Sequence, residues 1–236
     1  MRGVFITGTD TGVGKTTVTA YVAWGLRRRG IDVGVMKPIE TGHGGTGWPE
    51  DARRLATAAG VDDPREWVVP YVFADPVAPW VASQVTGRSI DWEPIVEAAR
   101  ALAARHEVLL VEGAGGIAVP IRADATMADL ASRLGLPVLV VARAQLGTLN
   151  HTVLTVHYAR ARGLRVVGLI LNGGRGPDAD LAERTNPGLL TAMTGLPILG
   201  QLPALSQAAG PPSPERLDAV AHVDWAALME PERWGG

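Results

Sequence analysis

The segment FITGTDTGVGKTTV, residues 5–18, joins an apolar run to a stretch of helix length and ends in GKT at positions 14–16. The usual phosphate-binding pattern, GxxxxGK followed by Ser or Thr, requires glycine at position 9, where this chain has Thr9. The nearest glycine is Gly8, one residue too early. The segment is therefore either a phosphate-binding loop lengthened by one residue or a glycine-rich turn that ends in GKT.

The residue types in this segment suit a phosphate. Glycines at positions 8, 12 and 14 let successive backbone amides curve around an anion, and the helix expected after them presents its positive N-terminal end. Lys15 can reach the β- and γ-phosphate oxygens of a nucleotide, and the Thr16 hydroxyl can ligate Mg²⁺. Its position between a strand and a helix favours the phosphate-binding interpretation.

Five short runs rich in β-branched residues recur along the chain, at residues 4–7, 33–36, 108–111, 138–141 and 166–171. They are continuously apolar, which is typical of strands covered on both faces. Stretches of helix length lie between and after them, at residues 15–29, 51–59, 91–105, 126–134, 148–162 and 178–193. This alternation predicts an α/β fold like that of P-loop NTPases, a mostly parallel sheet with helices on both faces. We expect one domain over residues 1–236, with a less regular excursion at residues 60–90.

Composition excludes several classes of protein. The 236 residues are 47% hydrophobic, and the net charge of −2 comes without a basic stripe, so we expect neither nucleic acid nor membrane as a partner. The absence of cysteine excludes disulfides, thiolate zinc sites and cysteine nucleophiles. The chain shows no secretory signal pattern and no apolar run of membrane-spanning length, so we expect a cytoplasmic protein.

Lysine is rare in this chain. Of its 22 basic residues, only Lys15 and Lys37 are lysine, and the other 20 are arginine. A site built around a compact ammonium group does not tolerate the planar guanidinium. Because both lysines directly follow strand-like segments, we predict that they serve one site at the carboxyl edge of the sheet.

Two carboxylates lie near the same expected edge. Glu112 belongs to VEGAGG at residues 111–116, where small residues permit close approach of a ligand. Glu112 can hold Mg²⁺, since this ion takes a few oxygen ligands beside substrate phosphates. Asp51 begins the helix after the Lys37 segment, and on its own it is typical of a residue that balances the helix dipole.

Taken together, these motifs resemble the dethiobiotin synthetase family. The resemblance rests on GTDTGVGKT at residues 8–16, KPIETG at 37–42, an aspartate at the start of the next helix, VEGAGG at 111–116, LGTLNHTVLT at 146–155 and LILNGG at 169–174. It covers most of the chain, and its most specific elements are the long loop and the KPIETG segment. The extra loop residue is this family's own spacing, so residues 8–16 are identified as a phosphate-binding loop.

The resemblance implies an ATP- and Mg²⁺-dependent ligase that closes a ring on 7,8-diaminononanoate with CO₂, through a carbamate and a phosphorylated carbamate. It assigns Lys15 to the β- and γ-phosphates and Lys37 to the carbamate and the transferred phosphoryl group. It assigns Mg²⁺ to Thr16, Asp51 and Glu112. The other nucleotide contacts that it implies are Gly12, Val13, Gly14, Thr17, Gly113, Ala114, Gly115, Asn172, Gly173, Leu202, Pro203 and Ala204, with Asn172 reading the base.

The substrate contacts implied by the resemblance come from three parts of the chain. Thr11 and Thr41 would hydrogen-bond the substrate or its carbamate. Leu146, Gly147 and Asn150 lie where a helix opens after a strand, and free amides there can bind the substrate carboxylate. The family places this segment across the two-fold interface of a homodimer.

Some positions depart from the family pattern. Thr41 stands where serine is common, Trp80 stands where histidine is often found, and Glu215 is a candidate for a ribose contact. Asn172 can both donate and accept, so the sequence leaves open whether the nucleotide is ATP or another triphosphate such as CTP.

A different class of function is the alternative, namely the P-loop ATPase switches of chromosome partition and division-site placement. Those proteins carry an additional lysine near the start of the loop, where this chain has Thr9 and Asp10. The sequence also lacks a basic amphipathic C-terminal helix that could hold a membrane. Both observations favour the ligase.

Overall fold

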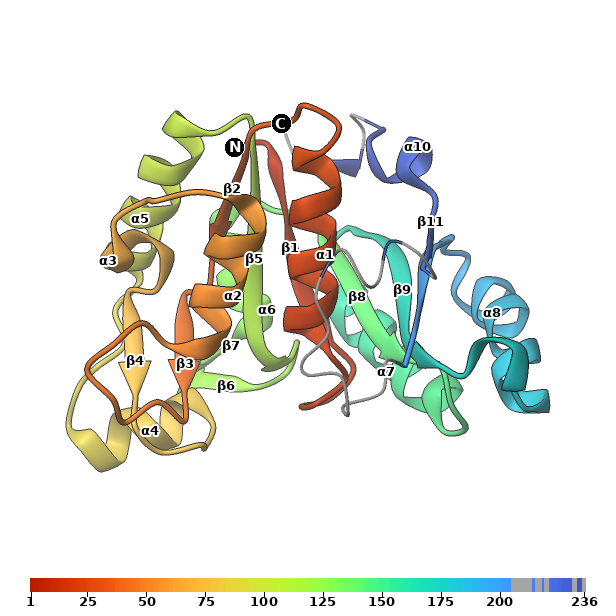
Figure 1. Ribbon diagram of the computed structural model, residues 1–236. Helices are drawn as coiled ribbons and strands as arrows, with labels where there is room; N and C mark the ends of the chain where they lie inside the picture. The colour runs from red at the N-terminus through yellow and green to blue at the C-terminus, as the bar shows by residue number, and fades with distance from the viewer. Residues whose placement is uncertain (205–213, 215–217, 219–220, 231–232, 235–236) are drawn as a thin grey trace.

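A seven-stranded sheet forms the centre of the protein (Figure 1). The computed structural model describes residues 1–204, 214, 218, 221–230, 233 and 234. The strand order is β11-β10-β9-β8-β1-β5-β2, and every neighbouring pair is parallel except β10 and β11. The strands are β1 (Gly3–Gly8), β2 (Val33–Met36), β5 (Val108–Gly116), β8 (Val138–Arg143), β9 (Val166–Gly174), β10 (Ile198–Pro203) and β11 (His222–Val223).

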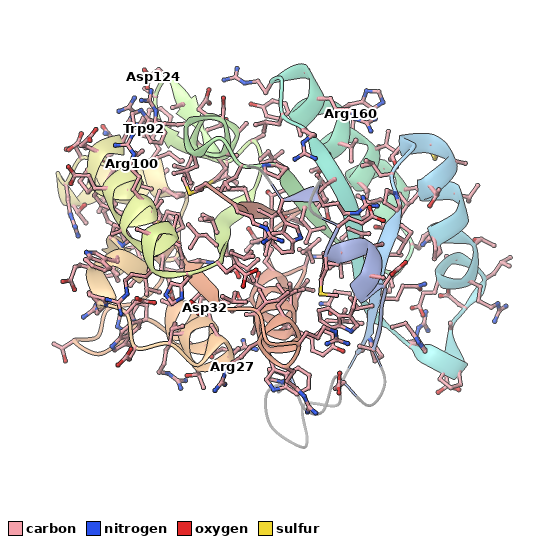
Figure 2. The ribbon with its side chains drawn as sticks, turned by 90° about the horizontal axis from the view of Figure 1, so that it is seen from above. Arg27, Asp32, Trp92, Arg100, Asp124 and Arg160 are labelled. Atoms are coloured by element: carbon pink, nitrogen blue, oxygen red, sulfur yellow. The ribbon has the colours of Figure 1, made fainter. Side chains whose placement is uncertain are left out.

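Helices cover both faces of this sheet. One face carries α1 (Lys15–Arg27), α2 (Glu50–Ala59) and α10 (Trp225–Leu228), and the other carries α5 (Trp92–Arg105), α6 (Met127–Leu134), α7 (Thr148–Ala161) and α8 (Leu181–Thr194). Seen from above, Arg27 of α1 and Arg160 of α7 lie on opposite sides of the sheet (Figure 2). Within the described ranges, no helix is long and apolar enough to cross a bilayer.

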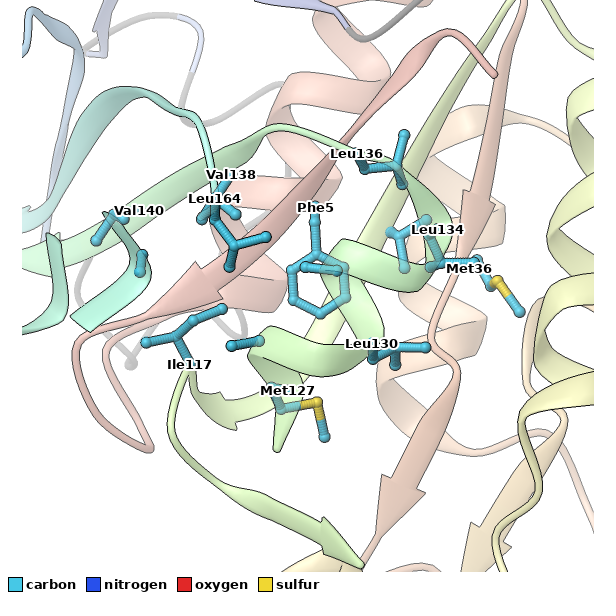
Figure 3. Close-up of a cluster of buried hydrophobic side chains, with 14 of the residues drawn as sticks. Phe5, Met36, Ile117, Met127, Leu130, Leu134, Leu136, Val138, Val140 and Leu164 are labelled. Carbon is cyan, nitrogen blue, oxygen red and sulfur yellow. The ribbon is translucent and has the colours of Figure 1, made fainter. Parts of the chain in front are cut away.

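The apolar runs are continuous because their side chains alternate between two cores. In β1, Phe5 packs into the core formed with α5, α6 and α7, while Val4 and Ile6 pack into the core formed with α1 and α2. Figure 3 shows the first of these cores, with Phe5 among side chains that include Met127 and Val138. A strand covered on both sides needs apolar residues at every position, since successive side chains point to opposite faces.

The predicted α/β architecture is confirmed, and each predicted strand and helix is present. The helix expected from residue 178 begins at Leu181 instead, because Asp180 caps it. Asp180 Oδ1 accepts a hydrogen bond of 2.9 Å from Glu183 N, and residues 176–178 form a short 3-10 turn. The strands β10 and β11 were not predicted.

Residues 60–90 are more regular than the sequence predicts, which corrects that expectation. They contain α3 (Arg65–Val68), β4 (Tyr71–Phe73) and α4 (Pro79–Thr86). β4 pairs in parallel with β3 (Ile39–Thr41), and Lys37 N donates a hydrogen bond of 2.7 Å to Val68 O. The segment therefore supports the strand that follows Lys37. A second two-stranded sheet joins β6 (Pro120–Arg122) to β7 (Ala125–Thr126).

Candidate active site

The predicted phosphate-binding loop connects the end of β1 to the start of α1, at the lower edge of the sheet in Figure 1. Gly12 and Gly14 have φ angles of 73° and 92°, a left-handed conformation that residues with a Cβ rarely adopt. At Gly14 an added Cβ would also lie 2.0 Å from Asn172 Nδ2. No described side chain caps the N-terminus of α1, so its first amides are available to an anion.

Both lysines are buried beside this loop, with Lys15 7% and Lys37 4% exposed. Lys15 Nζ donates a long hydrogen bond of 3.4 Å to Asp10 O. Burial, and after it the positive charge of Lys37, lowers the pKa of Lys15 below its usual value. An anionic ligand would stabilise this buried ammonium group.

Lys37 lies between the two carboxylates that the sequence predicts as metal ligands. Its Nζ is 2.9 Å from Asp51 Oδ2 and 2.5 Å from Glu112 Oε1, and Thr16 Oγ1 donates to the same Glu112 oxygen at 2.9 Å. Burial acts to lower the pKa of Lys37, but Glu112 and then Asp51 outweigh it and raise this pKa above its usual value. Burial acts to raise the pKa of Asp51, but Lys37 outweighs it and this pKa is lowered.

These groups line one cavity of about 330 Å³, here called the phosphate cavity. The predicted residues that line it are Thr11, Gly12, Gly14, Lys15, Thr16, Thr17, Lys37, Thr41, Asp51, Glu112, Ala114 and Gly115. Two predicted neighbours have other surroundings: Val13 is buried, and a Cβ added to Gly113 would lie 2.9 Å from the ring of Phe5. Residues from four parts of the chain thus meet at the carboxyl edge of the sheet.

The donor set of the phosphate cavity fits a Mg²⁺ ion bound beside a nucleotide. Glu112 is 0% exposed, and its Oε2 has no hydrogen-bond partner among the described residues. A buried carboxylate oxygen without a partner lowers the stability of the fold, and a bound ligand would supply the missing partner. Among the described residues, no group of three or more acidic or histidine side chains is arranged to hold a metal ion by itself. Two carboxylates with the Thr16 hydroxyl are nevertheless sufficient for Mg²⁺, which usually takes one or two carboxylates together with phosphates and water.

Glu40 also lines this cavity, although the sequence does not indicate it as a site residue. It is 6% exposed, and its Oε1 and Oε2 accept hydrogen bonds of 2.9 Å from Asp51 N and 3.0 Å from Ala52 N. Burial raises the pKa of Glu40 above its usual value. The available signal was its place in KPIETG, three residues after Lys37.

A second cavity, of about 700 Å³, lies where β9 and β10 end and is here called the base cavity. Leu202, Pro203 and Ala204 line it, and so do Arg175 and Glu183, which the sequence did not indicate. Arg175 Nε donates to Glu183 Oε1 at 2.8 Å, so these two side chains form an ion pair on the wall of this cavity.

Asn172 connects the strand beside the base cavity to the phosphate-binding loop. Its Nδ2 donates a hydrogen bond of 2.9 Å to Val13 O. The next residue, Gly173, accepts a hydrogen bond from Gln145 Nε2 through its carbonyl oxygen. The side chain predicted to read the base therefore also holds the loop.

A third cavity, of about 840 Å³, meets the phosphate cavity at Thr11, which lines both. Its walls include the side chains of Ile117, Val119, Leu154 and Tyr158 from the segment after β5 and from α7. We call it the apolar cavity. The sequence did not indicate it, because its two walls lie far apart along the chain.

The residues of segment 146–150 do not line these three cavities within one chain. Gly147 has a φ angle of 95° and begins α7, whose N-terminus no described side chain caps. Leu146 is 87% exposed, and Asn150 is also exposed. None of Leu146, Gly147 and Asn150 lines the phosphate cavity or the apolar cavity. Glu215, the candidate ribose contact, lies outside the described residues.

Known proteins resemble the chain in both sequence and fold. A family model described as an AAA domain matches residues 2–212. A protein of Anaeromyxobacter dehalogenans (strain 2CP-C), named ATP-dependent dethiobiotin synthetase BioD, is 50% identical over 203 residues, which are 86% of this chain and 90% of the relative. A protein of the same name from Bacillus licheniformis is 40% identical over 238 residues, covering 100% of this chain and 99% of the relative.

Solved structures add evidence on the fold alone. A ParA family ATPase from Chlorobium tepidum TLS matches with a TM-score of 0.56 at 14% identity, covering 97% of this chain and 99% of that one. This likeness confirms the P-loop NTPase fold and carries no information on substrate. The sequence relatives are far more similar and extend over nearly the whole chain. The chain therefore belongs to the family of ATP-dependent dethiobiotin synthetases and is a ligase.

Proposed function

We propose that this chain uses ATP and Mg²⁺ to form dethiobiotin from 7,8-diaminononanoate and CO₂ in biotin biosynthesis. The observation that carries the proposal is the phosphate cavity, in which two buried lysines lie beside two carboxylates at the ends of parallel strands. Carbamate, transferred phosphoryl group and phosphate are all anionic. Buried cations stabilise such charge more strongly than water does, because the site need not reorganise.

The nucleotide would extend from the phosphate cavity to the base cavity. Residues 12–17 would bind the phosphates through backbone amides, with Lys15 on the β- and γ-phosphates. Asn172 would contact the base, and residues 202–204 would form one wall of its pocket. The Asn172 bond to Val13 O supports this path, since it joins the two ends of the proposed nucleotide site.

The substrate would lie in the apolar cavity with its two amines at the phosphate cavity. Diaminononanoate carries both amines at one end of an apolar chain and a carboxylate at the other. An apolar cavity that opens at Thr11 suits the chain, and the Thr11 and Thr41 hydroxyls beside the phosphate cavity suit the amine and carbamate end.

The reaction would proceed in three steps. One amine attacks CO₂, forming a C–N bond and losing a proton, and gives a carbamate. A carbamate oxygen attacks the γ-phosphorus of ATP, the bond from that phosphorus to the bridging oxygen breaks, and ADP leaves. The second amine attacks the carbamoyl carbon, phosphate leaves with its C–O bond electrons, and loss of a proton completes the ring.

The protein's own residues would act mainly by charge and position in these steps. Lys37 would hold the carbamate and the transferred phosphoryl group, in line with the γ-phosphate that Lys15 holds. Thr16, Asp51 and Glu112 would hold Mg²⁺, which when bound neutralises phosphate charge. Glu112 is already oriented by Thr16, whose hydroxyl donates to it.

We further propose that residues 1–236 form one domain and that the working unit is a cytoplasmic homodimer. The N-terminus of α7, which no described side chain caps, supports the dimer, because Gly147 does not line the chain's own phosphate cavity. A partner subunit would then present Leu146, Gly147 and Asn150 to the substrate carboxylate.

The test is product formation by the purified protein. ATP, Mg²⁺, diaminononanoate and bicarbonate should give dethiobiotin, ADP and phosphate in equal amounts, and omission of diaminononanoate should abolish ADP release. Nucleotide hydrolysis that is indifferent to diaminononanoate and bicarbonate would instead favour an ATPase switch. That alternative is supported by structural likeness alone, and Thr9 and Asp10 stand where the switches carry their additional lysine.

A further inference from the structure

The N-terminus of helix α2 is capped by a side chain from outside the helix, that of Glu40 on strand β3. Its own N-cap residue is Pro49, which has no side-chain acceptor and makes no capping hydrogen bond. The amides that an N-cap side chain normally satisfies are those of the second and third helical residues. In α2 these are Asp51 N and Ala52 N, and both donate to the carboxylate of Glu40 on β3.

This contact joins three parts of the phosphate cavity. Glu40 is fixed on β3, which pairs with β4 at Val72, and it follows Lys37 by three residues. Asp51 receives a backbone contact from Glu40 and a side-chain contact of 2.9 Å from Lys37 Nζ. The carboxylate of Asp51 is therefore held by two residues of the same segment, one acting on its main chain and one on its side chain.

A serine or aspartate at position 49 would cap α2 without placing a third carboxylate in an anion-binding cavity. Glu40 is 6% exposed and lies beside Asp51 and Glu112 in a cavity proposed to bind phosphates. Burying a carboxylate there is costly, so a plain capping role does not account for it. Unlike a local cap, Glu40 connects the N-terminus of α2 to β3, the strand that follows Lys37.

We infer that Glu40 is a positioning residue, which sets Asp51 in place for Mg²⁺ and for Lys37 by tying the start of α2 to β3. The inference rests on the proposed function of the phosphate cavity. It does not require Glu40 to touch the nucleotide or the metal. Residues that orient metal ligands typically change metal affinity by about 10- to 100-fold when they are substituted.

The experiment measures Mn²⁺ binding by electron paramagnetic resonance, in the presence of a non-hydrolysable ATP analogue and without turnover. Glu40→Gln keeps the size of the side chain but turns one acceptor into a donor facing an N–H group, and we expect about tenfold weaker Mn²⁺ binding. The affinity for the analogue without metal should stay the same, because the phosphate-binding loop is untouched. Asp129→Asn is the control: the Asp129 carboxylate accepts hydrogen bonds from Thr126 N and Oγ1 at the start of α6, and Asp129 lines none of the three cavities.

A double variant separates positioning from capping. Glu40→Ala should lower both the melting temperature and the Mn²⁺ affinity. Adding Pro49→Ser restores a local cap for α2, so the melting temperature should recover while Mn²⁺ binding stays weak.

Recovery of both quantities in the double variant, or unchanged Mn²⁺ binding in Glu40→Gln, would overturn the inference. Failure of the wild-type protein to bind Mn²⁺ with the analogue would instead refute the proposed function of the cavity, and the inference with it.

Discussion

Lys37 and Glu112 form an ion pair inside the protein: Nζ of Lys37 lies 2.5 Å from Oε1 of Glu112, and the two residues are 4% and 0% exposed. The other Glu112 oxygen has no partner among the described residues. Lys37 therefore neutralises the carboxylate while leaving one oxygen for a ligand. Under the proposed function, Mg²⁺ and the Lys37 ammonium group both contact the Glu112 carboxylate. Substitutions of Lys37 can therefore test whether the site requires a lysine.

Lys37→Arg preserves the charge and should lose most turnover. The planar guanidinium cannot occupy the compact position between Asp51 and Glu112 and also meet the carbamate. We expect dethiobiotin formation to fall about 100-fold, which is typical for loss of a group that stabilises developing charge. The assay is product formation, with circular dichroism to verify folding. Near-normal turnover by the folded variant would contradict a special role for the ammonium group.

Lys37→Met should strengthen metal binding to the protein without nucleotide. Removal of the Lys37 ammonium group leaves the carboxylates of Asp51 and Glu112 without this partner. We therefore expect Mn²⁺ to bind to Lys37→Met about tenfold more tightly than to Lys15→Met. Lys15→Met is the matched control, because it removes the same charge without freeing those carboxylates. Without metal, Lys37→Met should lose about 3 to 5 kcal/mol of unfolding free energy, since a buried charge is left unpaired.

Two results would contradict this prediction. Equal Mn²⁺ affinities for the two variants would mean that only total charge matters. A melting temperature of Lys37→Met that Mn²⁺ does not raise would mean that the freed carboxylates do not bind the ion.

Much of this arrangement follows from local sequence. The phosphate-binding loop lies where its glycines and its place between strand and helix predict, and the two rare lysines line one cavity. Both depend on short segments and on the rule that parallel strands end at one edge of the sheet.

Other features depend on contacts between distant segments. In the sequence, Glu40 is one polar residue in an expected loop. It can cap α2 only because β3 pairs with β4 and because the N-cap residue of α2 is Pro49, which has no side-chain acceptor. Strand β10 escaped prediction because Gly200 and Pro203 weaken the strand signal in PILGQLP, although proline is tolerated at a strand end. The hydrogen bond from Asn172 to Val13 O likewise joins residues 159 positions apart.

Asn172→Leu should weaken binding of phosphates as well as of the base. The substitution keeps the approximate size, adds no charge and removes the hydrogen bond to Val13 O. We expect inorganic tripolyphosphate, which has no base, to bind about tenfold more weakly in calorimetry, as expected for a lost hydrogen bond that leaves a buried acceptor unsatisfied. The control is Ala204→Leu, which narrows the base cavity and should weaken ATP binding only. Unchanged tripolyphosphate binding in Asn172→Leu would limit Asn172 to contact with the base.

Asp51 should contribute stability that depends on pH in the acidic range. Its pKa in the folded protein is lowered, so the ionised form stabilises the fold above the unfolded pKa of about 4, and this stability is lost as pH falls through the folded pKa. The difference in unfolding free energy between wild type and Asp51→Asn should be constant from about pH 7 to 5 and shrink below about pH 4. Urea unfolding at a series of pH values measures it.

The control for the Asp51 series is Asp124→Asn. Asp124 forms an ion pair with Arg122 but its side chain is 77% exposed, and it lies at the surface in Figure 2. Because exposed pairs contribute little, this variant should match wild type throughout. An Asp51→Asn difference that is the same at pH 3 and pH 7 would show that the ionised carboxylate is not its source.

Two inactive chains should restore activity to each other if the substrate site is shared between subunits. Lys37→Ala removes the proposed contact to the carbamate, and Gly147→Glu places a side chain and a negative charge where α7 begins, at a φ angle of 95°. In a mixed dimer, one site would hold both defects and the other would hold neither, so about half of the mixed dimer's sites should work. The measurement is dethiobiotin formation after subunit exchange, and labelled chains show that the exchange is complete.

The matched control is Lys37→Ala mixed with Lys15→Ala. This mixture should recover no activity, because both lysines line the same chain's phosphate cavity. If exchange is complete and the first mixture stays as inactive as the control, each chain binds the whole substrate by itself.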